Sequence, residues 1–252
     1  MAISSTIRTM PADCDHDHTP LIITIDGPAG TGKSTVAHGL AERLGLEYLD
    51  TGAMYRAAAV IALDQNLDPA DGEALAEAVA GAEMRFHWAE NPPPLMLGER
   101  DISDRIRDMD VSAIVSIVAA QPAVRRVLVQ EQRRIASGHP RLVTEGRDQG
   151  SVVFPDAPLR FYLDADVSVR AERRMKQLAE AGKPVDRAHV MRDIRKRDRI
   201  DSTREDGPLT RPDGAIDIDT NHRTAEEVVD LMESIVRENL PDATGHPSRI
   251  RP

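Results

Sequence analysis

The sequence predicts an α/β fold in which a parallel sheet is covered by helices on both faces. Short apolar segments rich in β-branched residues alternate with longer segments whose apolar residues recur at helical spacing, and the first short segment runs into a glycine-rich turn, "GPAGTGKS". The chain has 252 residues, 40% of them hydrophobic and 29% charged, which suits one large domain. Ligands bind such sheets at the carboxyl ends of the strands, so candidate site residues are sought there.

The individual elements follow from local patterns in chain order. The first strand, Leu21–Asp26, is a β-branched run that stops at a glycine. The helix at Val36–Gly45 carries apolar residues four positions apart and ends at a glycine. A second strand at Leu46–Asp50 precedes a helix at Ala57–Leu67. Three further strands are predicted at Arg141–Gly146, Leu159–Ala165 and Gly214–Thr220, before a terminal amphipathic helix at Thr224–Glu238.

The segment Ala82–Arg107 interrupts this alternation and is predicted to be a small antiparallel β insertion. "MRFHW", "LML" and "ISDRI" indicate strands, separated by a rigid turn at Pro92–Pro94 and by "GER". A long helical region follows at Val111–Ala136, broken or kinked near Pro122. The insertion is assigned to 82–107, the core to 20–81 and 108–240, and disordered ends to 1–19 and 241–252.

Composition excludes several classes of function. The net charge of -10 and the aromatic content of 3% argue against binding a nucleic-acid polymer, which needs unopposed cations or stacking platforms. Cys14 is the only cysteine, so an internal disulfide or a cysteine zinc cluster is excluded. No apolar run has the length of a membrane span, and the N-terminus lacks the apolar core of a secretory signal. A cytoplasmic monomer without a membrane partner is expected.

The segment Gly27–Ser34 matches the phosphate-loop pattern G-x-x-x-x-G-K-[ST], between a predicted strand and a predicted helix. Its glycines allow backbone N–H groups to face phosphate oxygens, and the helix start adds positive charge. Lys33 can reach the β- and γ-phosphates of ATP, and the Ser34 hydroxyl can ligate Mg²⁺. The base-reading N-K-x-D sequence of G domains is absent. The predicted ATP-binding residues here are Gly27, Pro28, Ala29, Gly30, Thr31, Gly32, Lys33, Ser34 and Thr35.

Charged residues follow two other strand ends. Asp50 is a candidate for contact with Mg²⁺ or its water shell; Thr51 follows it directly, and Arg56 lies six residues later. An ordinary strand–helix junction capped by Thr51 explains the same pattern. Arg147 and Asp148 follow the third strand, where a structural ion pair is the alternative. The run "RKRDRIDSTRE" at 195–205 indicates either a solvated helix surface or cations that meet an anionic ligand.

Five segments taken together resemble the bacterial cytidylate kinase family, the (d)CMP kinases of the nucleoside monophosphate kinase group. They are "ITIDGPAGTGKST", "LDTGAMYR", "GRDQGSVVFPDAP", "FYLDADVSVRAERRM" and "RKRDRIDSTR", and the resemblance spans Leu21 to Glu238. It implies a P-loop three-layer sandwich with a five-stranded parallel sheet, a monophosphate-binding β insertion at 82–107 and a helical lid at about 170–206. It also implies transfer of a phosphoryl group from ATP to CMP or dCMP with Mg²⁺.

The resemblance assigns site residues by position. It implies that Arg170 and Arg173 bind ATP, and that Lys33, Arg147, Arg174 and Arg197 are catalytic. The implied CMP-binding residues are Thr51, Tyr55, Arg56, Ser116, Arg125, Arg147, Asp148, Arg197, Asp201 and Arg204. Three departures stand out: Thr51 replaces the usual serine, Glu145 a frequent aspartate, and Arg199–Ile200 more acidic or polar residues.

The chemistry of cytosine fits this assignment. Asp148 can accept a hydrogen bond from the N4 amino group, Arg125 can donate to the N3/O2 side, and Ser116 can assist. Uracil would place its O4 acceptor against the carboxylate, so a buried pair of this kind discriminates strongly. Arginine forks match phosphate oxygens, and Asp201 is expected to meet the ribose hydroxyls. The alternatives are a kinase of another monophosphate, chiefly UMP, a shikimate-type kinase of a small metabolite, and an ATP-binding switch protein.

Overall fold

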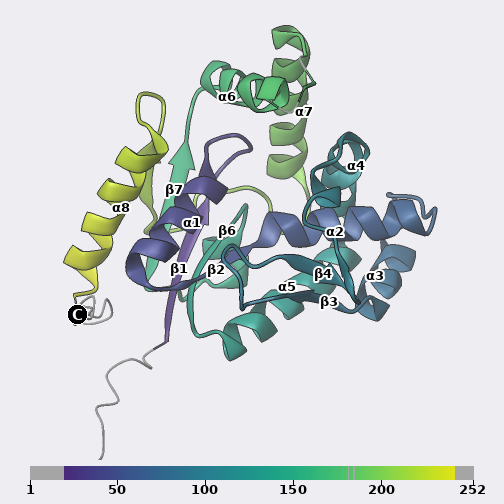
Figure 1. Cartoon of the computed structure of the whole chain (residues 1–252), viewed down its shortest axis with the longest axis horizontal. Coiled ribbons are helices and arrows are strands. Elements are labelled where there is room, and N and C mark those ends of the chain that lie inside the picture. The colour runs from purple at the N-terminus through teal and green to yellow at the C-terminus, as the bar shows by residue number, and fades with distance from the viewer. Residues whose placement is uncertain (1–19, 181, 184, 242–252) are drawn as a thin grey trace, which may run out of the picture.

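A computed structural model describes residues 20–180, 182–183 and 185–241 and contains a five-stranded parallel sheet. The predicted arm at 1–19 lies outside the described residues, as does the predicted tail except for Pro241. The strand order is β2-β6-β1-β7-β8, which confirms the predicted fold class (Figure 1). The strands are β1 (Leu21–Asp26), β2 (Glu47–Asp50), β6 (Arg141–Gly146), β7 (Leu159–Asp164) and β8 (Ile216–Asp219).

Two apolar cores lie on opposite faces of this sheet. On one face α1 (Lys33–Leu44) and α8 (Ala225–Asn239) cover Ile23, Ile25 and their neighbours, all of them buried. On the other face α2 (Thr51–Asp64), α3 (Gly72–Gly81), α4 (Met109–Ala119) and α5 (Pro122–Gly138) form a second cluster that includes Leu49 and Leu142. Burial on both faces explains why the central strand β1 is almost continuously apolar.

The helical region predicted at Val111–Ala136 is two helices. Pro122 starts α5, and α4 and α5 are bent by 96° relative to each other. Within the described residues no single helix is long and apolar enough to span a membrane; α4 and α5 taken as one bent pair pass that test by length and composition alone. Both helices contribute buried residues to the second apolar core, which accounts for their apolar character.

Several predicted boundaries were wrong. The second helix begins at Thr51 instead of Ala57, because the Asp50 carboxylate accepts a hydrogen bond from the Ala53 amide and caps it. In the insertion, β3 (Met84–Phe86) and β4 (Leu95–Leu97) lie where expected. The third strand, β5 (Arg100–Asp101), replaces the expected strand at "ISDRI", which instead leads into the 3₁₀ helix η1 (Arg105–Arg107). Helix α3 was not predicted.

Two helices, α6 (Val167–Glu180) and α7 (Arg187–Thr203), form a hairpin beyond the carboxyl end of β7 (Figure 1). They share a small apolar cluster of Ala171, Val190 and Ile194, which is separate from the two sheet cores. The hairpin therefore has its own packing and meets the sheet at its root. It coincides with the segment that was predicted to be a lid.

Candidate active site at the carboxyl edge of the sheet

Three carboxylates lie at neighbouring strand ends, as predicted. In the sheet register Asp26 pairs with Gly146, and Asp50 pairs with Glu145. The loops that carry the phosphate-loop motif and the Arg147–Asp148 pair therefore leave the sheet side by side. Asp26 joins them directly, since its two carboxylate oxygens accept hydrogen bonds of 2.8 Å from the Gln149 and Gly150 amides at the start of the π-helix η2 (Gln149–Val153).

The phosphate loop packs tightly on the rest of the site. Gly27 has a φ of +146°, and a Cβ there would lie 2.1 Å from the Leu163 carbonyl oxygen, so the close approach to β7 requires glycine. Gly32 precedes α1 in a left-handed conformation. Lys33 is buried, and its Nζ donates to the Pro28 carbonyl oxygen at 2.8 Å. Burial and the neighbouring Arg147 lower the pKa of Lys33 to about 7.

An oxygen-rich group lies at the start of α1. The Ser34 hydroxyl donates to Glu145 Oε1 at 2.7 Å. Burial and the adjacent Glu145 carboxyl raise the pKa of Asp50 to about 7. Thr51 Oγ1 donates to the Glu145 carbonyl oxygen at 2.6 Å, which fixes the start of α2 against β6. No group of three or more His, Cys, Asp or Glu side chains suited to a metal ion occurs among the described residues.

A buried ion pair forms one wall of the site. The Arg125 guanidinium on α5 contacts the Asp148 carboxylate, and both side chains are at most 2% exposed. Arg125 Nη1 also donates to the Tyr55 hydroxyl at 3.1 Å, and Asp206 lies 3.5 Å from Arg125 Nε. Gly207 covers the pair so closely that a Cβ would lie 1.9 Å from Arg125 Nη2.

A group of cations surrounds the space next to this pair. Arg147 Nε binds Asp201 Oδ2 at 2.9 Å, and Arg204 Nη2 lies 3.8 Å from Asp148 Oδ1. Arg56 donates to the Ile106 carbonyl oxygen at 3.1 Å and to Ser112. Burial together with Arg147 and Arg56 lowers the pKa of Arg197 to about 10. The Arg197 Nε atom is buried and has no hydrogen-bond partner among the described residues.

The predicted ATP-binding arginines of α6 contact the phosphate-loop backbone. Arg170 Nη1 donates to the Ala29 carbonyl oxygen at 3.0 Å, and Arg173 Nη1 donates to that of Thr31 at 3.3 Å. Arg174 is half-buried and donates to Gln177 at 3.5 Å. Arg170 and Arg173 therefore lie beside the phosphate loop and face its carbonyl oxygens, whereas Arg174 makes no such contact among the described residues.

The charge run at 195–205 divides between buried and exposed side chains. Asp201 is buried and Arg197 and Arg204 are at least half-buried, whereas Arg195, Lys196 and Arg199 are exposed. Ser116 is buried on α4. Sequence reasoning missed two residues that pair with arginines of the site, Asp198 and Asp206. The position of Asp26 at a strand end was noted, but only the fold shows which amides it meets.

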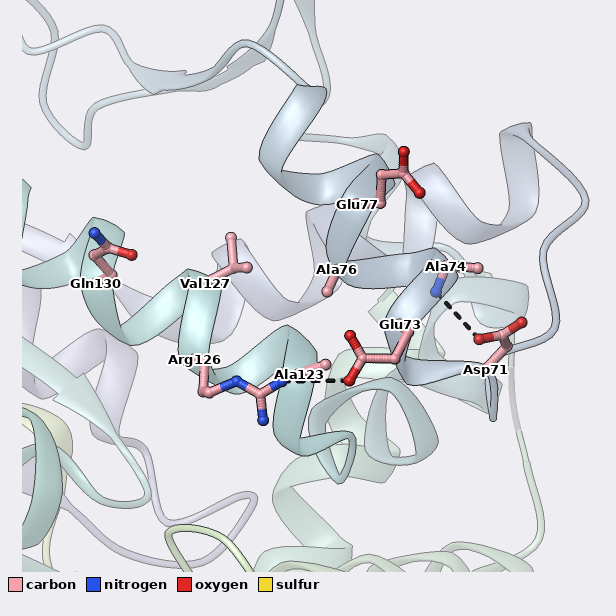
Figure 2. A pocket seen from close by; sticks show the side chains of 9 residues that line it. All are labelled: Asp71, Glu73, Ala74, Ala76, Glu77, Ala123, Arg126, Val127 and Gln130. Atoms are coloured by element: carbon pink, nitrogen blue, oxygen red, sulfur yellow. Dashed lines mark hydrogen bonds and ion pairs between the residues drawn. The ribbon is translucent and has the colours of Figure 1, made fainter.

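An open groove lies elsewhere, between α3 and α5. Figure 2 shows its lining, where Arg126 pairs with Glu73 at 3.3 Å and Asp71 caps α3 through the Ala74 amide. The remaining lining residues are Ala76, Glu77, Ala123, Val127 and Gln130. None of the predicted site residues lines this groove, so we do not assign it to the reaction.

The parallel sheet, the phosphate loop at its carboxyl edge and the arginine-bearing hairpin define a P-loop kinase. The family model for cytidylate kinase matches residues 23–238. The cytidylate kinase of Mycolicibacterium paratuberculosis is 44% identical over 218 residues, which cover 86% of this chain and 96% of that relative. That of Caldanaerobacter subterraneus subsp. tengcongensis is 44% identical over 217 residues, with 86% and 95% coverage. The chain belongs to the cytidylate kinase family.

Among solved structures, the shikimate kinase of Bacteroides thetaiotaomicron gives a TM-score of 0.44 at 12% identity, covering 87% of this chain and 99% of that chain. This resemblance is too weak to inform the choice of substrate.

Proposed function

We propose that this chain transfers the γ-phosphoryl group of ATP to CMP and dCMP by in-line attack, forming CDP and dCDP. The proposal is carried by one observation: a buried Arg125–Asp148 pair lies beside a group of crowded cations next to the phosphate loop. The pair provides a donor and an acceptor for a base, and the cations provide charge for phosphates. Burial, together with repulsion by Arg147 and Arg56, lowers the pKa of Arg197, and an anion bound beside it favours its charged form.

The base is recognised by the buried pair. Asp148 accepts from the cytosine N4 amino group and Arg125 donates to its N3/O2 side, with Ser116 assisting from α4. Tyr55 holds the second guanidinium nitrogen of Arg125, so it acts by positioning Arg125. Because Asp148 is 2% exposed, uracil would place its O4 acceptor against a buried carboxylate, with no proton to share between the two oxygens. Selection of cytosine over uracil follows from that cost.

The acceptor phosphate and ribose lie nearer the phosphate loop. Arg56, Arg147 and Arg197 hold the CMP phosphate, Asp201 meets the ribose hydroxyls, and Thr51, Tyr55 and Arg204 complete the CMP-binding set. The insertion supports Arg56, because Arg56 donates to the Ile106 carbonyl oxygen. The assignment of 82–107 to monophosphate binding remains a prediction.

The donor side consists of the phosphate loop, Lys33 and the lid arginines. The attacking phosphate oxygen is already ionised at neutral pH, so no general base is required, and positioning with charge stabilisation supplies the catalysis. Arg147, Arg174, Arg197 and Lys33 are the cations assigned to that role. Lys33, whose pKa of about 7 reflects burial without a phosphate, becomes fully charged when phosphate oxygens replace the Pro28 carbonyl.

Mg²⁺ fits the oxygen atoms at the start of α1. A hydroxyl on Ser34 and the carboxylates of Glu145 and Asp50 are hard ligands of the type Mg²⁺ prefers. The raised pKa of Asp50, caused by burial and by Glu145, indicates a carboxylate pair that a cation would stabilise in its charged form. Ser34 would hold the ion, with Asp50 and Glu145 nearby; a bound ion neutralises charge on the phosphates.

Rates of CDP, dCDP and UDP formation from CMP, dCMP and UMP, measured side by side with ATP, test the proposal. We expect CMP and dCMP to be good substrates and UMP a poor one. Equal turnover of UMP would favour the broader monophosphate kinase, and tight CMP binding without CDP formation would favour an ATP-binding switch protein. The expected monomeric state and cytoplasmic location remain predictions.

A further inference from the structure

Asp198 is a charged residue of α7 that lies between two proposed CMP contacts, one position after Arg197 and three before Asp201. Its Oδ2 is 2.8 Å from Arg170 Nη1. Its other oxygen, Oδ1, is buried and has no hydrogen-bond partner among the described residues. Asp198 therefore faces inward, toward the root of the α6–α7 hairpin, although its side chain is 23% exposed.

Arg170 continues this connection to the phosphate loop. Its side chain is 5% exposed, Nε donates to the Ala165 carbonyl oxygen at 2.9 Å, and Nη1 donates to that of Ala29 at 3.0 Å. Gly30 packs directly on it, since a Cβ at Gly30 would lie 3.2 Å from Arg170 Cβ. One guanidinium thus joins the end of β7, the phosphate loop and α7. Because three groups hold the Arg170 guanidinium, a shift of any one of them moves the guanidinium and disturbs its contacts with the other two.

We propose that the Asp198–Arg170 pair couples the two substrate sites, so that ATP in the phosphate loop favours the position of α7 that binds CMP. Asp198 and Arg170 act as positioning residues in this role. ATP fixes the phosphate loop, the loop fixes Arg170 through Ala29, and Arg170 fixes α7 through Asp198. The α6–α7 hairpin can respond as a unit because it has its own apolar cluster. This inference rests on the proposed function, since it takes CMP as the ligand of α7.

The coupling is measured as the ratio of CMP affinities, by titration calorimetry, in the presence and absence of a saturating nonhydrolysable ATP analogue. We expect the analogue to raise CMP affinity in the unmodified chain about 5-fold or more. In Asp198→Asn, which keeps the shape but removes the charge, the ratio falls toward one. The affinities for each ligand alone should change by less than about 2-fold, because Asp198 belongs to neither proposed binding set. This pattern distinguishes coupling from a structural role, which would weaken both ligands.

Asp193→Asn is the matched control, because Asp193 is an exposed carboxylate on the same helix and pairs with His189. It should leave the ratio unchanged. Arg170→Lys is the second variant, since an ammonium cannot reach Ala165, Ala29 and Asp198 at once, and it should lower the ratio as Asp198→Asn does.

An unchanged ratio in Asp198→Asn, or an equal loss in Asp193→Asn, would overturn the inference. A ratio of one in the unmodified chain would also overturn it while leaving the kinase proposal intact. Failure of the unmodified chain to bind CMP would instead refute the proposed function.

Discussion

The proposed donor and acceptor sides of the site are built in different ways. The donor side is one continuous segment, 27–34, whose glycine backbone lies against β7, and its arginine partners bind backbone carbonyl oxygens. The acceptor side is assembled from side chains of α2, α4, α5, α7 and the loop after β6, and two of its arginines, Arg125 and Arg147, pair with carboxylates. A backbone site tolerates little change of shape, whereas a side-chain site depends on the identity of each residue. Substitutions on one side should therefore change that side's function more than the other's.

The largest difference between the effect on CDP formation and the effect on ATP binding is expected from Arg147→Ala. Arg147 lies on the acceptor side and binds Asp201, yet it is close enough to Lys33 to lower the pKa of that lysine. We expect CDP formation to fall by about 10²–10³-fold, because a charge that stabilises the transferring phosphate is lost. Binding of an ATP analogue should change little. Arg199→Ala is the control, since Arg199 is an exposed arginine of α7. An equal loss of ATP binding would show that Arg147 supports both sides.

Asp148→Asn tests whether the acceptor side reads the base. Asparagine can present an amide donor to uracil O4, so we expect the ratio of CMP to UMP turnover to fall by about 100-fold. The change also weakens a buried ion pair with Arg125, at a cost of about 3 kcal/mol in stability, so thermal unfolding is measured in parallel. Asp206→Asn is the matched control, because Asp206 is 38% exposed and lies 3.5 Å from the same arginine. An unchanged ratio would refute the base-reading role.

The difference between the two sides also explains what the sequence could predict. The phosphate loop is contiguous, so its pattern and its strand–helix context identified it without the fold. The acceptor residues are spread from Thr51 to Arg204, and only a family resemblance placed them together. That resemblance did not reveal Asp26, Asp198 or Asp206, because their roles depend on which amide or guanidinium the fold brings near them. Boundaries failed where a cap decided them, as at Asp50, whose carboxylate starts α2 six residues early.

Asp26 directly precedes the phosphate loop and accepts hydrogen bonds from the Gln149 and Gly150 amides, so it connects the two sides. Its titration tests how much this buried connection contributes to stability. Burial raises its pKa from 3.8 to about 7, despite the amide hydrogen bonds from Gly150 and Gln149. Between these values the folded chain holds a proton that the unfolded chain has lost. The contribution of Asp26 to the free energy of unfolding therefore falls as pH rises from about 4 to 7, by about 1.4 kcal/mol per pH unit, and is constant above that range.

Urea unfolding of the unmodified chain and of Asp26→Asn, at several pH values from 5 to 8, measures this slope. We expect the free energy of unfolding of the unmodified chain to exceed that of Asp26→Asn by the largest amount at pH 5, and this difference to shrink toward pH 7. The other shifted groups nearby, Lys33 and Asp50, are present in both chains, so their contributions largely cancel. A difference independent of pH would mean that Asp26 stays ionised in the folded chain and that its two amide hydrogen bonds outweigh its burial.

The smallest effect is expected at Thr51, where the chain has threonine in place of the family's usual serine. Its hydroxyl donates to the Glu145 carbonyl oxygen at 2.6 Å and its side chain is buried, so it holds α2 against β6 beside the proposed CMP site. Thr51→Ser keeps the hydroxyl and should change the KM for CMP by less than about 2-fold, with a stability loss of about 1 kcal/mol for the missing methyl group. Thr51→Val keeps the volume but leaves the carbonyl without its donor, at about 1–3 kcal/mol. If valine were tolerated as well as serine, shape alone would explain the residue, and the acceptor side would resemble the donor side at this position.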